Sequence, residues 1–85
     1  MILFTDEAFK QYTAWHKNDS KKLKKINELI LDIKKSGDKG SPKALHGLYK
    51  GCFSRRIDLK NRLVYTFDEK NELIIMQCTG HYDDK

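Results

Sequence analysis

The sequence contains few of the features that mark secreted, membrane-spanning or disordered proteins. Its 85 residues include one proline and two cysteines. The apolar run Met1–Phe4 is too short for a signal peptide, and no other segment approaches the length of a membrane span. Cys52 and Cys78 lack the paired spacing of a metal site and lie in apolar patterns. Free thiols in a reducing cytoplasm are therefore expected, in preference to a disulfide, a metal site or a nucleophile.

The composition is that of a small folded protein. Hydrophobic residues make up 39% of the chain and charged residues 34%, which predicts one domain over residues 1–85. Lysine and arginine number 17 against 12 acidic residues, giving a net charge of +5. This excess favours a polyanionic partner, although a solvated lysine face accounts for it equally well.

The first half of the chain predicts a short strand over residues 2–4 and two helices. Thr5 can cap a helix over about residues 6–16, with acidic residues in its first turn. A second helix begins near residues 18–20 and ends near residue 36. Its apolar residues recur at helical spacing and form one face: Leu23, Ile26, Leu29, Ile30 and Ile33. A loop follows over residues 38–42.

From residue 51 onward the apolar pattern has a period of two. Strands are predicted over residues 51–58, 62–67 and 73–79, with a tight turn near 59–61 and a polar loop over 68–71. The order is β-α-α-β-β-β. It predicts an α+β fold in which a small, antiparallel-rich sheet packs on the two N-terminal helices and leaves its other face open for a ligand.

Strand alternation brings chemically active side chains together on one face. Arg56 and Arg62 are expected to face one another across a hairpin, and His81 joins them if the last strand has matching register. Arginine binds phosphate through two parallel hydrogen bonds, and histidine exchanges a proton near neutral pH. The cluster therefore indicates RNA phosphate chemistry. Arg55, which alternation places on the other side of its strand from Arg56, is another candidate RNA-binding residue.

The lysines of the second helix form a second candidate RNA-binding surface. Lys24 and Lys25 lie opposite the apolar face, and further lysines share their side. A solubilising surface is the simpler interpretation of each lysine alone, whereas the group can bind ribosomal RNA through counterion release.

Taken in order, several short motifs resemble the YoeB/Txe toxins of the RelE superfamily. They are Lys24-Lys25-Ile26-Asn27-Glu28-Leu29-Ile30, Ser54-Arg55-Arg56-Ile57, Arg62-Leu63-Val64-Tyr65 and His81-Tyr82. The resemblance covers nearly the whole chain. It implies a RelE-like fold and the activity of a ribosome-dependent messenger-RNA endonuclease that an antitoxin controls.

The resemblance also implies a mechanism that uses no metal, no cofactor and no protein nucleophile. The ribose 2′-hydroxyl attacks the adjacent phosphate of a codon in the ribosomal A site. Arg62 matches the arginine assigned to phosphate stabilisation, and His81 the histidine assigned as general acid. Tyr82 matches an aromatic residue that can orient the RNA or stack on a base. Arg56 matches a second arginine in the same groove.

One position departs from the family pattern. Lys43 stands in Ser41-Pro42-Lys43-Ala44-Leu45, where the family carries a glutamate proposed as general base. A lysine at its reference pKa of about 10.4 is almost fully protonated at pH 7, so it accepts a proton only if nearby positive charge or burial lowers its pKa. Three hypotheses follow. Lys43 acts as a base or a transition-state cation, His46 acts as the base, or the toxin is weakened or inactive.

The resemblance implies partners as well. They are a YefM-like antitoxin, the ribosome and its messenger RNA, and operator DNA bound through the toxin–antitoxin complex, all in the cytoplasm. An alternative hypothesis is a catalytically weakened homologue that acts mainly as an antitoxin-binding partner and co-repressor.

Overall fold

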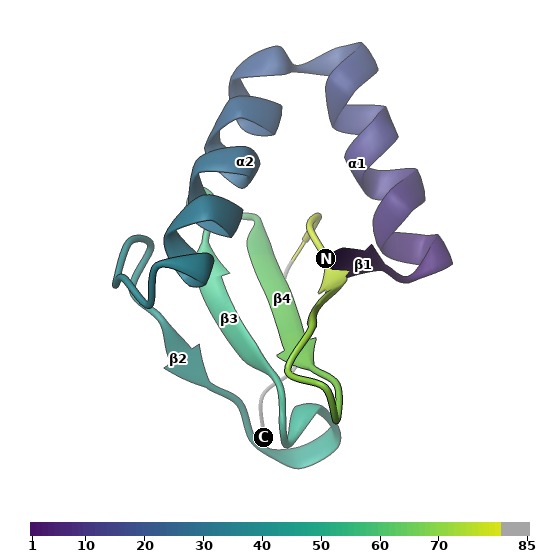
Figure 1. Ribbon diagram of the computed structural model, residues 1–85. Helices are drawn as coiled ribbons and strands as arrows, with labels where there is room; N and C mark the ends of the chain where they lie inside the picture. Colours follow the sequence, from purple (N-terminus) through teal and green to yellow (C-terminus); the bar gives the residue numbers. More distant parts are fainter. Residues whose placement is uncertain (81–85) are drawn as a thin grey trace.

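A computed structural model describes residues 1–80 of the chain (Figure 1). The elements follow in the order β1 (Ile2–Phe4), α1 (Asp6–Asn18), α2 (Ser20–Lys34), β2 (Lys43–Ala44), a 3₁₀ turn η1 (Gly47–Tyr49), β3 (Phe53–Arg56), β4 (Arg62–Phe67) and β5 (Leu73–Gln77). The predicted α+β class and element order are confirmed. The structure adds β2 and η1, which the sequence pattern did not indicate.

Both helices begin at side-chain caps. The Thr5 hydroxyl accepts a hydrogen bond from the backbone N–H of Ala8 at 3.1 Å. α2 is capped by Asp19, whose carboxylate accepts from the N–H groups of Lys21 and Lys22. These carboxylate and hydroxyl oxygens satisfy N–H groups that have no partner within the helix. α1 continues two residues beyond the predicted end at His16.

The sheet has the strand order β1-β5-β4-β3-β2. β1 pairs in parallel with β5, and every other pair is antiparallel. The β4 strand has the predicted bounds, whereas β3 and β5 are shorter than predicted. β5 ends early because the N–H of Cys78 bonds to the Gln11 side chain of α1 at 2.7 Å instead of to a strand.

The core lies between the helices and one face of the sheet. Figure 1 shows both helices on the same side of the strands, joined by a sharp bend. The predicted apolar face of α2 supplies Ile26, Leu29, Ile30 and Ile33, which pack with Leu63, Tyr65, Leu73 and Ile75 of the sheet. Each such side chain contributes about 1.5–3 kcal/mol on full burial. The helices therefore cover one face of the sheet and leave the arginines of the other face outside the core.

The two cysteines are free thiols, as predicted. Cys78 is buried and Cys52 is half-buried. Within residues 1–80, neither helix is long and apolar enough to cross a membrane.

Candidate functional site

Three cationic side chains gather at a groove of about 220 Å³ on the face of the sheet that the helices leave uncovered. It is lined by Ser41, Lys43, Ser54, Arg56 and Arg62. Arg56 and Arg62 are direct cross-strand partners in the β3–β4 hairpin, and Lys43 pairs with Ser54 between β2 and β3. The predicted meeting of the two arginines is confirmed. The serines were not predicted to line a site.

The two arginines differ in how firmly they are held. Nη1 of Arg62 donates to the backbone carbonyl oxygens of Asp58 and Asn61, at 2.5 and 3.1 Å. Its Nε and Nη2 make no hydrogen bond within residues 1–80. Arg56 is exposed, and in the same part of the chain its guanidinium makes no hydrogen bond or ion pair. One guanidinium is thus fixed to the backbone, and the other can adapt to a ligand.

The end of the described chain lies beside Arg62. The Arg62 N–H donates to the carbonyl oxygen of Gly80 at 3.0 Å, and the Gly80 N–H donates to Oδ1 of Asn61 at 2.7 Å. His81 and Tyr82, the predicted acid and stacking residue, lie outside the described residues. The last described residue, Gly80, lies next to Arg62 and precedes His81 in the sequence.

Arg55, a predicted RNA-binding residue, is buried and does not line the groove. Its side chain is only 4% exposed and lies on the helix-covered face of the sheet. It donates to the Asp32 carboxylate at 2.5 Å, to the Tyr65 hydroxyl at 3.1 Å, and to the carbonyl oxygens of Gly37 and Lys39 at 2.9 and 3.2 Å. These partners satisfy a buried charge that would otherwise be costly. Arg55 therefore joins β3 to the end of α2 and the following loop.

The other predicted cations lie away from the groove. Lys24 and Lys25 belong to α2, on the opposite side of the sheet. A lysine of the same helix, Lys22, forms an ion pair with Asp58 at 2.7 Å. His46 is exposed and occupies the N-cap position of η1, but it is not among the residues that line the groove. The structure does not bring these lysines or His46 together with Arg56 and Arg62.

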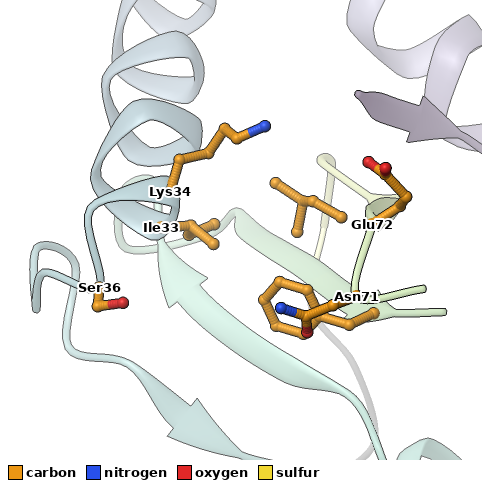
Figure 2. A pocket seen from close by; sticks show the side chains of 7 residues that line it. Ile33, Lys34, Ser36, Asn71 and Glu72 are labelled. Atoms are coloured by element: carbon orange, nitrogen blue, oxygen red, sulfur yellow. The ribbon is translucent and has the colours of Figure 1, made fainter. Parts of the chain in front are cut away.

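A larger hollow of about 380 Å³ lies between the end of α2 and the β4–β5 loop (Figure 2). Figure 2 shows Lys34 extending from α2, with Asn71 and Glu72 across the hollow. Glu72 is already paired with the Met1 ammonium group at 2.9 Å. Within residues 1–80, no group of three or more His, Cys, Asp and Glu side chains could hold a metal ion, here or elsewhere. The cationic groove is the better candidate site.

Comparisons with known proteins identify the relatives of this chain. A family model described as a YoeB-like toxin of bacterial type II toxin–antitoxin systems matches residues 4–82. Toxin YoeB of Streptomyces coelicolor is 41% identical over 83 residues, covering 95% of this chain and 98% of that protein. Toxin YoeB of Escherichia coli K12 is 36% identical over the same coverage.

Solved structures show the same relationship. A YoeB/ParE toxin from Agrobacterium tumefaciens superposes with a TM-score of 0.91 at 32% identity, covering 95% of this chain and 98% of that one. The toxin in a heterotetrameric YoeB–YefM complex from Staphylococcus aureus gives 0.87 at 41% identity, with 96% and 97% covered. The chain therefore belongs to the family of YoeB-like toxins of bacterial type II toxin–antitoxin systems.

Proposed function

We propose that the protein is a ribosome-dependent endoribonuclease that cuts messenger RNA in the A site and so inhibits translation. The observation that carries this proposal is the groove in which Lys43, Arg56 and Arg62 meet on one face of the sheet. Three cations around one small groove suit a bound phosphodiester, whose negative charge increases as the 2′-hydroxyl attacks.

Arg62 is the group best suited to the transition state. Two backbone carbonyl groups fix its Nη1, so little reorganisation is needed when charge develops on the phosphate. Its remaining N–H groups are the donors proposed to bind the non-bridging oxygens. The exposed Arg56 is proposed to hold the RNA backbone in register for in-line attack.

Proton transfer to the leaving 5′-oxygen is assigned to His81, on the strength of the family resemblance. Gly80, which precedes it in the sequence, is hydrogen-bonded to Arg62 and Asn61. Tyr82 is proposed to stack on a base of the codon.

Lys43 is proposed to act as a cation that stabilises the phosphate. It lines the groove with two arginines, and no carboxylate of residues 1–80 lines it with them. His46 lines no part of this groove, which makes it the weaker candidate for the base. The groove therefore favours electrostatic stabilisation of the phosphate by Lys43 over the carboxylate base that the family carries at this position.

The proposed partners follow from the family. Solved relatives include a YoeB–YefM toxin–antitoxin complex, and we expect this chain to bind a YefM-like antitoxin, and operator DNA through that complex, in the cytoplasm. A net charge of +5 suits both an acidic antitoxin segment and ribosomal RNA, to which Lys24 and Lys25 are proposed to contribute.

The test is cleavage of messenger RNA on programmed ribosomes under single-turnover conditions. Arg62→Ala should lower the rate roughly 10²–10³-fold and His81→Ala roughly 10²–10⁴-fold. Lys70→Ala, an exposed cation in the β4–β5 loop, is the matched control and should leave the rate unchanged. EDTA should leave the cleavage rate unchanged as long as the ribosomes stay intact. Full activity of both site variants would refute the assignment.

The substitution at Lys43 favours a second candidate function. A toxin without the family glutamate could serve mainly as an antitoxin-binding partner and co-repressor. In that case, strong induction without antitoxin would leave growth unimpaired, and Lys43→Glu would create cleavage that the parent lacks. Under the first proposal the parent is toxic, and Lys43→Glu slows cleavage because it replaces a phosphate-stabilising cation with an anion.

A further inference from the structure

We propose that Lys22 and Asp58 are positioning residues that hold the Arg62 guanidinium in place at the groove. The inference deepens the proposed function, in which Arg62 binds the phosphate, and rests on it. Lys22 belongs to α2, Asp58 lies in the turn between β3 and β4, and Arg62 follows that turn as the first residue of β4. Neither Lys22 nor Asp58 lines the groove, so we expect their effect on the reaction to pass through Arg62.

The turn between β3 and β4 supplies both acceptors that hold the Arg62 side chain. Nη1 donates to the backbone carbonyl oxygens of Asp58 and Asn61 at 2.5 and 3.1 Å. The Asn61 carbonyl oxygen also accepts from the N–H of Ile57 at 3.0 Å, which closes the turn. Arg56 stands directly opposite Arg62, and like charges in that arrangement repel one another. The place of the Arg62 guanidinium therefore depends on where the turn holds its two carbonyl groups.

The shape of this turn depends on the Asp58 carboxylate. Oδ1 accepts from the N–H groups of Lys60 and Asn61 at 2.8 and 2.7 Å, an arrangement by which aspartate side chains stabilise turns. The Asn61 side-chain amide donates to both oxygens of the same carboxylate at 3.1 Å. One carboxylate thus ties together Asp58 and Asn61, the two residues whose carbonyl groups hold Arg62.

Lys22 fixes the carboxylate to a helix. Its Nζ lies 2.7 Å from Oδ2 of Asp58, and both side chains are partly buried. The hydrogen bond from Lys22 is the main cause that holds the pKa of Asp58 well below its usual range, so the carboxylate is charged at neutral pH. Lys22 lies in the first turn of α2, where its own N–H donates to the Asp19 cap at 3.3 Å. Because α2 packs on the sheet through Ile26 and Leu29, the ion pair ties the turn to the core.

Loss of the ion pair should slow the chemistry and leave ribosome binding unchanged. A displacement of about 1 Å can lower a rate roughly 10²-fold when a group moves out of its productive position. Asp58→Ala removes the turn cap and the ion pair together, so single-turnover cleavage should be slower by roughly 10²-fold. Lys22→Met and Asp58→Asn remove only the ion pair, and their rates should fall between those of Asp58→Ala and the parent.

The other hairpin supplies a matched control for the turn. Oδ1 of Asp68 accepts from the N–H groups of Lys70 and Glu72, both at 2.9 Å, in the turn between β4 and β5, and Asp68 does not line the groove. Asp68→Ala should therefore lower Tm as a lost turn cap does, yet cleave at the parent rate. Lys17→Met, at an exposed lysine of α1, is the control for Lys22→Met and should also cleave at the parent rate.

Double variants separate positioning of Arg62 from general destabilisation. If Asp58 acts through Arg62, Asp58→Ala should have little further effect on cleavage in an Arg62→Ala background, although it should still lower Tm there. An equal fold-loss of cleavage in both backgrounds would show a merely structural role and overturn the inference. Lys22→Met combined with Asp58→Asn should be no slower than the slower single variant, since both remove one ion pair. A rise in the ribosome Kd of Lys22→Met, with an unchanged rate at saturation, would show a direct RNA contact and overturn the inference too.

NMR of the arginine side-chain nitrogens tests the held guanidinium without ribosomes. Two carbonyl acceptors on Nη1 should slow its rotation, so the parent and Asp68→Ala should give separate Nη1 and Nη2 signals that disappear in Arg62→Ala. In Asp58→Ala these signals should merge, and in the milder Lys22→Met, which serves if Asp58→Ala does not fold, they should broaden. Unchanged signals in both variants would overturn the inference even if cleavage fell. A parent chain that fails to cleave on ribosomes would instead refute the proposed function, and with it the catalytic part of this inference, whatever the NMR signals show.

Discussion

Gly40 occupies a position in the loop before β2 where both the backbone angle and the available space call for glycine. Its φ is +74°, and its carbonyl oxygen accepts from the Arg56 N–H at 2.6 Å. A Cβ at this position would lie 2.9 Å from the Arg56 carbonyl oxygen and 2.9 Å from Cδ2 of Leu29. The loop therefore approaches β3 as closely as a glycine allows, against the backbone of Arg56, an arginine of the groove.

Gly40→Ala should lower the free energy of unfolding by two separable amounts. The left-handed backbone conformation costs alanine about 1–2 kcal/mol. The contact with a strand carbonyl group that cannot move aside adds about 1–3 kcal/mol, as in overpacked cores. Gly51→Ala isolates the first amount, because Gly51 has φ +91° and an added Cβ would have no atom within 4 Å.

Urea unfolding followed by circular dichroism measures both variants against the parent. Gly51→Ala should lose only the conformational part, and Gly40→Ala should lose about 1–3 kcal/mol more. For a domain of this size, each kcal/mol corresponds to a fall in Tm of about 4–8 °C. Equal losses in the two variants would refute the close approach of the loop to β3. A loss confined to the slope of the transition would indicate a change in the unfolded state instead.

Three further predictions concern the charged and thiol side chains. Arg55→Leu should lower the free energy of unfolding, measured in urea, by about 3 kcal/mol. This is at the lower end for breaking a buried ion pair, because its carboxylate partner Asp32 keeps some exposure. An unchanged urea midpoint would contradict a stabilising role for the Arg55 hydrogen bonds. Iodoacetamide followed by mass spectrometry should label Cys52 well before Cys78, since Cys78 is fully buried and burial raises its pKa to about 12. Lys22 holds the pKa of Asp58 below the value of an unfolded aspartate, so the ionised Asp58 carboxylate stabilises the folded state. This stabilisation is present above about pH 4 and is lost as the pH falls further. Asp58→Asn should therefore make the free energy of unfolding less dependent on acid pH.

The sequence predicted best where a periodic pattern coincides with burial. The apolar face of α2 was predicted from spacing alone, and Ile26, Leu29, Ile30 and Ile33 are buried as expected. The bounds of β4 were predicted correctly because its alternation is regular and a turn precedes it. β2 was missed since two residues, Lys43 and Ala44, are too few to establish any period.

The errors in the candidate site have a different physical cause. Alternation correctly placed Arg55 on the face opposite Arg56, yet its charge suggested an RNA contact. Its true role depends on Asp32, which lies 23 positions away in the sequence and comes close only when α2 packs on the sheet. The link from Asn61 to Gly80 spans 19 positions and depends in the same way on how β4 and the end of β5 meet. No local pattern contains such pairings.

The distribution of ion pairs explains why positive charge persists at the groove. Asp32 and Asp58 each neutralise a cation, but these cations are Arg55 on the covered face and Lys22 of α2. Arg56 and Arg62 have no ion pair within residues 1–80, although they stand directly opposite one another across β3 and β4. Two like charges placed directly opposite one another destabilise the hairpin, and a bound polyanion would remove that repulsion. Asp32 and Asp58 therefore pair with cations outside the groove, and the two arginines are left to be neutralised by a ligand such as the proposed phosphodiester substrate.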